Sequence, residues 1–224
     1  MKKIEIKKIA VSAIIIAVAF VITMMTASFK VQFLSLDLKD AVLSIISLLF
    51  GPYYGFISVI AVSLLEFITI STTGWYGLVM NIISSGTFAL VVGFIYKYKR
   101  SFSGAIIAAV CTVFSVTAVM LLANIFITPF YLELMGAPKS LAIEMLPTVL
   151  LPFNLSKSLL NCSIMLLIYK PFTTALKKCR LIENSGTVKY KFNIKSAILA
   201  IVSIVIIICV LIYMVLSLKL GLSV

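Results

Sequence analysis

Long apolar runs, separated by short polar or basic segments, dominate the chain. The hydrocarbon core of a bilayer is about 30 Å thick and needs about 20 apolar residues per spanning helix. Runs of about this length predict helices near residues 9–27, 53–70, 77–96, 103–127, 148–169 and 195–218. A shorter apolar segment, 39–50, predicts a seventh helix, whose polar outer end lies against protein rather than lipid.

The segments between these runs predict one tight turn and several longer connections. "FGPYYG", residues 50–55, has one Pro and two Gly and predicts a tight, uncharged inner turn. Longer outer loops are expected at 28–38, 71–76 and 128–147, the last of which contains Pro129 and Pro138. The expected domains are a bundle at 1–178, a basic cytoplasmic linker at 179–194, and an additional transmembrane helix with its tail at 195–224.

Composition places the chain in a membrane. Of its 224 residues, 62% are hydrophobic and only 12% are charged, and the mean hydropathy is +1.22. A soluble domain has too little interior to cover that much apolar surface. The net charge of +12 comes from short clusters between apolar runs, which indicates membrane orientation rather than nucleic-acid binding.

The distribution of basic residues predicts the topology. Fourteen of the 19 Lys and Arg residues lie on the predicted inner side, four lie on the outer side, and Lys157 lies within a span. Cytoplasmic segments carry the excess of basic residues, so the N-terminus is expected inside. The run 9–27 is long enough to span, which favours a retained first helix over a signal peptide.

Three polar residues share one face of the helix predicted at 148–169. Asn154, Lys157 and Asn161 in "PFNLSKSLLN" are spaced i, i+3, i+7. Lys157 lies 13 residues before Lys170, about 20 Å along the helix axis, in the outer half of the membrane. A Lys within a span costs about 2.5–3.5 kcal/mol, so we expect it to face the bundle interior or a wet cavity. The alternative is a side chain that snorkels to the outer headgroups.

Asn124 in "LLANIFITPFY" adds a second amide at the same level. It lies about 36 Å along its helix from Arg100. Two amides and an ammonium at one depth suit a planar solute with polar edges, because Lys only donates whereas Asn both donates and accepts. Hydrogen bonding between helices is the alternative.

Other polar and aromatic residues point less directly to a site. Glu66 is expected to be solvated or paired with Lys39, ahead of a ligand role. Trp75 and Tyr76 form an interfacial aromatic belt or, alternatively, a stacking wall for a ring. The chain has no His, which excludes His-based catalysis and His metal sites.

Several motifs together resemble the substrate-binding S components of energy-coupling factor (ECF) transporters, most closely the riboflavin-specific type. The resemblance covers about residues 8 to 172. It rests on Ala13-xxx-Ala17, "LDLKDA", "FGPYYG", "TGWYG", "ANIFITPFY" and "PFNLSKSLLN". It implies an all-α membrane protein with a six-helix S-component bundle, to which residues 195–218 add one extra C-terminal hydrophobic helix.

The resemblance also implies a function and a set of residues. The chain would be a high-affinity binding subunit in the cell membrane that takes riboflavin from outside. It would deliver riboflavin inward by toppling on a coupling module of one membrane subunit and two ATPases, without a cofactor or metal of its own. The resemblance implies Asn124, Asn154 and Lys157 for the ligand and Ala13 and Ala17 for docking on the coupling subunit. Trp75, Asp40 and Glu66 complete the set of candidate ligand residues.

Two departures and three alternatives accompany this interpretation. The extra helix is one departure. The other is the absence of a Lys shortly after Glu66, which concerns the contacts to the ribityl chain and not those to the ring. The ligand is alternatively another vitamin or a purine- or pterin-like compound. The other classes are a membrane-embedded enzyme, which the scarcity of intramembrane carboxylates disfavours, and an assembly subunit without a ligand.

Overall fold

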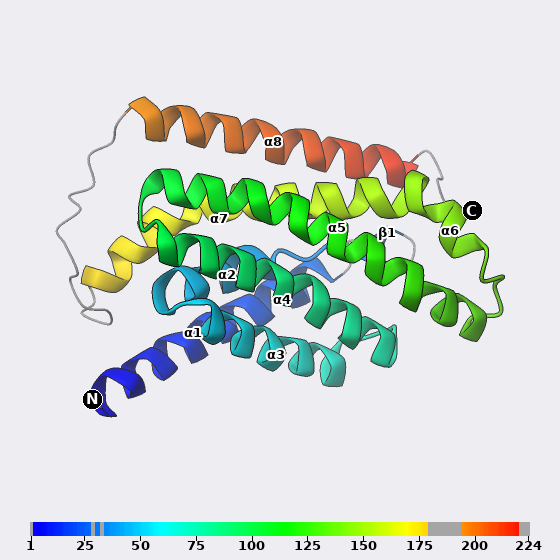
Figure 1. The fold of residues 1–224 in the computed structure, drawn as a ribbon, viewed down its shortest axis with the longest axis horizontal. Helices are drawn as coiled ribbons and strands as arrows, with labels where there is room; N and C mark the ends of the chain where they lie inside the picture. Colours follow the sequence, from blue (N-terminus) through cyan, green and yellow to red (C-terminus); the bar gives the residue numbers. More distant parts are fainter. Residues whose placement is uncertain (1, 28–29, 32–33, 179–193, 220–224) are drawn as a thin grey trace.

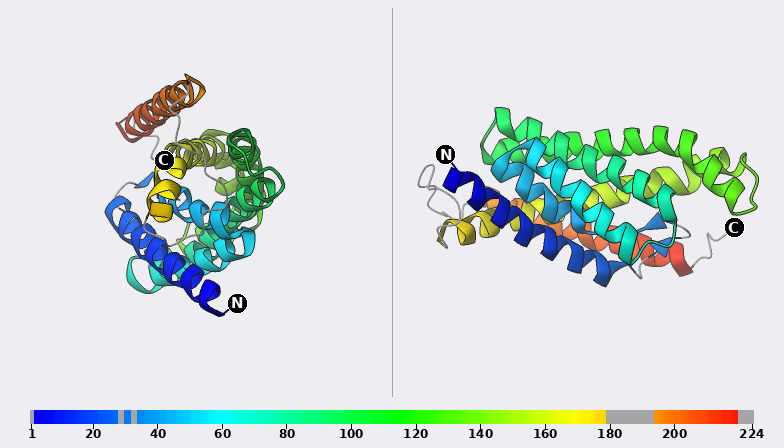
Figure 2. Two further views of the ribbon diagram at one scale, coloured as in Figure 1. Left: turned by 90° about the vertical axis from the view of Figure 1, so that its left-hand side faces the viewer. Right: turned by 90° about the horizontal axis from the view of Figure 1, so that it is seen from below.

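The computed structural model describes residues 2–27, 30–31, 34–178 and 194–219. Most of the expected linker, residues 179–193, lies outside these ranges. The described elements are α1 (Lys2–Thr26), β1 (Lys30–Val31), β2 (Leu34–Ser35), α2 (Lys39–Phe50), α3 (Pro52–Thr69), α4 (Gly74–Tyr98), α5 (Phe102–Leu134), α6 (Leu141–Met145), a π-helical turn (Leu146–Leu150), α7 (Leu151–Lys178) and α8 (Ile194–Lys219). The long helices lie along one another in an elongated bundle (Figures 1 and 2).

The bundle confirms the predicted all-α membrane class. Among the described residues, five helical stretches are long and apolar enough to cross a bilayer: Ile6–Thr26, Pro52–Thr69, Gly74–Tyr98, Ser103–Leu134 and Leu141–Phe172. Half or more of each apolar window remains unburied, so its outward side chains need lipid. The extra C-terminal helix, α8, lies along the bundle beside α7 (Figure 1).

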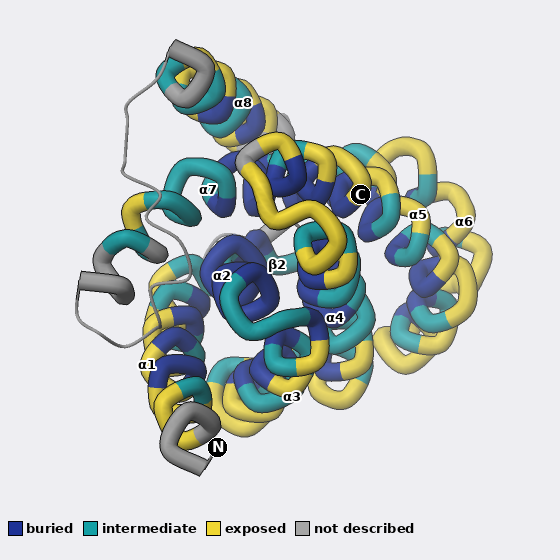
Figure 3. The backbone as a smooth tube through the Cα atoms, turned by 60° about the vertical axis from the view of Figure 1, so that its left-hand side comes forward, coloured by how far each residue is buried: buried dark blue, intermediate teal, exposed yellow. Residues whose placement is uncertain are grey.

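Helix α2 is short because it begins inside the bundle. Its 12 residues reach about 18 Å, whereas the 25 residues of α1 reach about 37 Å. Ten of the 12 residues of α2 are buried, and helices α1, α3, α4 and α7 pack around it (Figure 3). The strands β1 and β2 pair antiparallel and lead the chain into the interior, to the start of α2. Non-helical backbone at this depth is stable only where protein covers it.

The expected outer loop at 128–147 is largely helical, so that prediction was wrong. Helix α5 continues through Pro129 to Leu134, and α6 and the π-helical turn lead directly into α7. Only residues 135–140 form a turn outside a helix. Proline ends helices in water, but in a membrane protein neighbouring groups and local π geometry compensate for the lost hydrogen bond.

The turn between α2 and α3 packs closely on α4. Gly51 has a φ of 100° and allows the tight reversal before Pro52. Gly93 of α4 lies against this turn, and a Cβ atom there would lie 2.6 Å from the Pro52 Cα. Backbone cannot move aside as easily as a side chain, so this contact requires glycine.

We expect Gly93→Ala to destabilise the bundle by about 1–3 kcal/mol, because the added methyl group pushes α4 away from the α2–α3 turn. Gly86→Ala on the same helix is the matched control, since its Cβ would meet only the flexible Phe56 ring, at 2.9 Å. Thermal unfolding of both variants in detergent measures the difference. Equal losses would contradict the backbone contact.

Candidate ligand-binding site

The segment that enters the bundle has two chemically different sides. Residues 34–39, "LSLDLK", alternate between apolar and polar side chains, and an extended chain points successive side chains to opposite sides. Leu36 belongs to an apolar cluster with residues of α7 and α8, and Leu34 and Leu38 pack against that cluster. On the polar side, Asp37 and Lys39 are buried in the bundle and Ser35 lines its cavities. We call residues 34–39 the entry segment.

Asp37 is the centre of a buried charge network. The Lys157 Nζ donates to Asp37 Oδ2 at 2.9 Å, and the Lys39 Nζ lies 3.7 Å from the same oxygen. Lys39 also pairs with Glu66 Oε2 at 2.5 Å, and the Asn81 Nδ2 donates to that oxygen at 2.9 Å. The network joins the entry segment and α2 to α3, α4 and α7. Charges in a membrane interior persist when they are paired in this way.

Lys157 faces the interior of the bundle, as its depth predicted. The side chain is only 10% exposed and ends on Asp37, so it does not snorkel toward the headgroups. The pairing of Glu66 with Lys39, one of the two expectations for Glu66, is also present. Sequence reasoning missed Asp37, because it lay in an expected outer loop. The alternation of "LSLDLK" is the signal that identifies it.

Asn161 supports the start of α2 rather than a ligand. Its Oδ1 accepts a hydrogen bond from the Ala41 N–H at 3.0 Å, and its Nδ2 donates to the Asp37 carbonyl at 3.0 Å. The first N–H groups of a helix have no partner within the helix, and water is scarce at this depth. Asn161 therefore anchors the irregular backbone where α2 begins.

A cleft of about 100 Å³ lies between α4, α5 and α7, and the entry segment forms one of its walls. We call it the main cleft. Its polar lining includes Asn154 and Lys157 of α7, Asn81 of α4 and Thr128 of α5. Its aromatic lining is Tyr76, Tyr131 and Phe153. The Tyr76 and Tyr131 rings meet edge to face, with centroids 5.6 Å apart.

The structure brings two of the three predicted ring-binding residues to this cleft. Asn154 and Lys157 both line it, and Asn154 Nδ2 donates to the Leu150 carbonyl at 2.7 Å. Asn124 lies one layer behind: it is fully buried, and its Oδ1 accepts from the Thr128 hydroxyl at 2.7 Å. Asn124 therefore does not line the cleft itself, but it holds Thr128, which does.

The remaining predicted ligand residues lie outside the main cleft. Trp75 is 69% exposed and packs on Phe67, and its neighbour Tyr76 occupies the cleft wall instead. Asp40 is buried in the first turn of α2 and is absent from the lining. Of the two adjacent aromatic residues, Tyr76 is the one that lines the cleft.

Glu66 and Asp37 line an adjoining cavity of about 60 Å³. This cavity shares Ser35, Thr73 and Asn81 with the main cleft. Among the described residues, three buried oxygens that belong to its lining have no hydrogen-bond partner: Asp37 Oδ1, Glu66 Oε1 and Ser63 Oγ. The residues around this cavity therefore carry acceptors and hydroxyl groups, which suit a ligand rich in hydroxyls.

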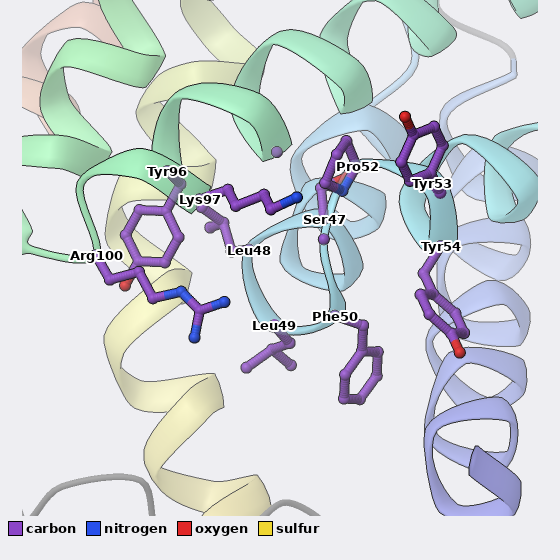
Figure 4. Close-up of a pocket in the computed structure, with 12 residues that line it drawn as sticks. Ser47, Leu48, Leu49, Phe50, Pro52, Tyr53, Tyr54, Tyr96, Lys97 and Arg100 are labelled. Carbon is purple, nitrogen blue, oxygen red and sulfur yellow. The ribbon is translucent and has the colours of Figure 1, made fainter.

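A third cavity, of about 150 Å³, is formed by the α2–α3 turn and the end of α4. Its lining includes the cationic side chains of Lys97 and Arg100 together with Tyr96 and residues of the turn (Figure 4). None of the predicted ligand residues belongs to it. This basic, partly aromatic character is typical of a bundle end at the membrane interface.

Ala13 and Ala17 lie on the outward face of α1. Both are exposed, whereas Val11, Ile15 and Ala19 of the same helix pack into the core. The small side chains leave a shallow strip on which another helix can approach closely.

Comparisons with known proteins agree with this architecture. A family model described as "ECF transporter, substrate-specific component" matches residues 7–171. A solved structure, from the study "Structure and mechanism of the S component of a bacterial ECF transporter", is 26% identical, with a TM-score of 0.62. The alignment covers 77% of this chain and 99% of that one. No curated protein matches.

We expect Asp37→Asn to destabilise the protein by about 3–5 kcal/mol, because it leaves the buried ammonium group of Lys157 without its ion-pair partner, while Lys39 keeps Glu66. The matched control is Glu133→Gln, which removes an exposed ion pair with Lys139 of 2.9 Å and should cost less than about 1 kcal/mol. Denaturant unfolding in detergent measures both. A small loss for Asp37→Asn would contradict the central role of the network.

Proposed function

The chain belongs to the family of ECF transporter substrate-specific components, and from this premise we propose that it binds riboflavin for uptake. The observation that carries the proposal is the Lys157 ammonium at the wall of the main cleft, held there by Asp37. Lys has three N–H donors, and Asp37 accepts one of them, which leaves two for a ligand.

The lining of the main cleft suits a flat ring with polar edges. The carbonyl oxygens of the isoalloxazine ring would accept hydrogen bonds from the Lys157 ammonium. Its ring N–H would donate a hydrogen bond to the Asn154 Oδ1. Tyr76 and Phe153 supply aromatic surface for its faces. The adjoining cavity, with the free oxygens of Glu66 and Asp37, suits the hydroxyl groups of a ribityl chain.

The two cavities must widen to admit such a ligand. Together they provide about 160 Å³ (100 and 60 Å³), whereas ligand pockets usually span about 300–1,000 Å³. Ser35 of the entry segment lines both cavities. We therefore propose that the entry segment moves outward when riboflavin binds and that the two cavities then merge.

The same donors and acceptors also fit a purine- or pterin-like ring, which is the second candidate ligand. The edges of these rings carry carbonyl, amino and ring-nitrogen groups that resemble those of a flavin. They lack the ribityl chain, however, and leave the adjoining cavity unfilled. Its unpaired oxygens favour riboflavin.

Purified protein should quench the fluorescence of riboflavin on binding, and Asn154→Ala should raise the Kd at least about tenfold, because the ring loses a buried partner. Ser156→Ala on the same helix is the control, since Ser156 is not in the cleft lining.

Titration of riboflavin, a purine and a pterin into wild type and both variants measures these effects. Wild-type protein without affinity for riboflavin would exclude that ligand. Equal Kd values for the two variants would remove Asn154 from the site.

We further propose that the outward face of α1 docks on the membrane subunit of an ATPase-driven coupling module. The exposed Ala13 and Ala17 lie one turn apart there and permit close helix contact. The chain has no GxxxxGK[ST] motif, so two ATPase subunits would supply the energy. Docking then topples the subunit, and its cleft opens inward.

We expect Ala13→Trp to lower riboflavin uptake about tenfold or more in cells that contain the coupling module, with the Kd for riboflavin unchanged, because the indole holds the partner helix away. Ala118→Trp is the control, since Ala118 is an exposed alanine on α5. Uptake of labelled riboflavin measures the effect. An equal loss of uptake in both variants would contradict docking through α1.

A further inference from the structure

Helix α8 lies beyond residues 7–171, the part of the chain that the family model matches. It runs beside α7 along the bundle (Figures 1 and 2). Among the side chains of α8 that the structure describes, Ser203 and Val210, seven residues apart, are buried, and Ile206 and Ile207 between them are partly buried. This spacing defines one stripe that faces protein, whereas the rest of its described surface is mostly exposed and apolar.

The buried stripe of α8 covers the apolar side of the entry segment. Val210 belongs to one cluster with Leu36 of that segment and with Phe153 and Leu160 of α7. Helix α8 also contacts β1, the strand that precedes the segment. The leucines of "LSLDLK" therefore pack on the cluster of α7 and α8, while Ser35 and Asp37 of the same segment line the two cavities.

The entry segment depends on contacts from both sides. A two-stranded ribbon is only marginally stable by itself. On the polar side, the Asp37–Lys157 pair holds the segment to α7. On the apolar side, lipid would provide no hydrophobic driving force for closure, whereas interdigitated side chains of a fixed helix provide close packing. The position of α8 therefore influences how readily the segment moves.

We propose that α8 is a lateral clamp that holds the entry segment against the main cleft and so slows release of the bound ligand. Val210 and Leu36 are positioning residues in this clamp, because both belong to one apolar cluster and neither lines the main cleft. The effect on release rests on the proposed ligand-binding function, whereas the effect on the segment itself does not.

The full-length chain offers a matched pair of variants. Val210→Ala removes two methyl groups from the buried cluster, and Val205→Ala makes the same change at a position 52% exposed on the same helix. Amide hydrogen exchange of peptides that cover residues 30–40 should be about three- to tenfold faster in Val210→Ala than in Val205→Ala. Exchange in α3 and α4 should stay equal, which distinguishes a local opening from general destabilisation.

Stopped-flow measurement of riboflavin release tests the consequence for the ligand. Val210→Ala should release riboflavin about three- to tenfold faster than wild type, and Val205→Ala should match wild type. Leu36→Ala should have a similar effect, and the double variant with Val210→Ala should show less than the product of the two single effects, because both changes disrupt the same apolar cluster.

Each outcome decides between the two proposals. Equal exchange at residues 30–40 in the two valine variants would overturn the clamp, as would faster exchange without faster release. If wild type binds no riboflavin, the proposed ligand is wrong. The exchange comparison, which needs no ligand, then still decides whether α8 holds the segment.

Discussion

A buried cluster of five charged side chains is the constraint on which the rest of the structure depends. Asp37, Lys39, Asp40, Glu66 and Lys157 are all nearly inaccessible in a protein whose outer surface faces lipid. Removing charges from water costs several kcal/mol each, and only mutual pairing offsets this cost. Pairing requires the entry segment, the start of α2, and helices α3 and α7 to meet at one place. The bundle is therefore built around the point at which these four parts converge.

The short helix α2 follows from the same convergence. If α2 were as long as its neighbours, Asp37 and Lys39 would lie near the membrane surface, far from Lys157. Because α2 has 12 residues, the chain must reach its start in extended form, and Asn161 satisfies backbone groups that water would otherwise bind. An extended segment beside helices leaves space on its polar side, and the main cleft occupies that space. Its apolar side needs a cover, which α7 and α8 supply.

Sequence periodicity and length predicted much of this fold, because lipid imposes strict rules on long apolar runs. The apolar segment 39–50 coincides with α2, and the burial of Lys157 followed from the energetic cost of a charge at its depth. Asp37 could not be placed in the same way. The alternation of polar and apolar residues over 34–39 is a weak signal beside the seven apolar runs that predict helices. The helical path through Pro129 was missed because the rule that prolines end helices comes from water-exposed chains. Trp75 and Tyr76 are adjacent, and small errors in helix phase decide which of the two lines the cleft.

The position of the charges also bears on reorientation in a membrane. A protein that tilts within lipid meets a barrier set by the charges that it exposes to hydrocarbon. Among the side chains that the structure describes, those of the central charges point inward and are paired or buried. The exposed charges, Lys7, Lys97, Lys99, Arg100, Glu133, Lys139 and Glu144, lie near the ends of long helices. A rotation of the whole bundle therefore moves the charge network without exposing it to lipid. The proposed toppling requires this combination of an apolar exterior and a buried polar interior. Helix α8 extends that seal on the side where the entry segment would otherwise face lipid.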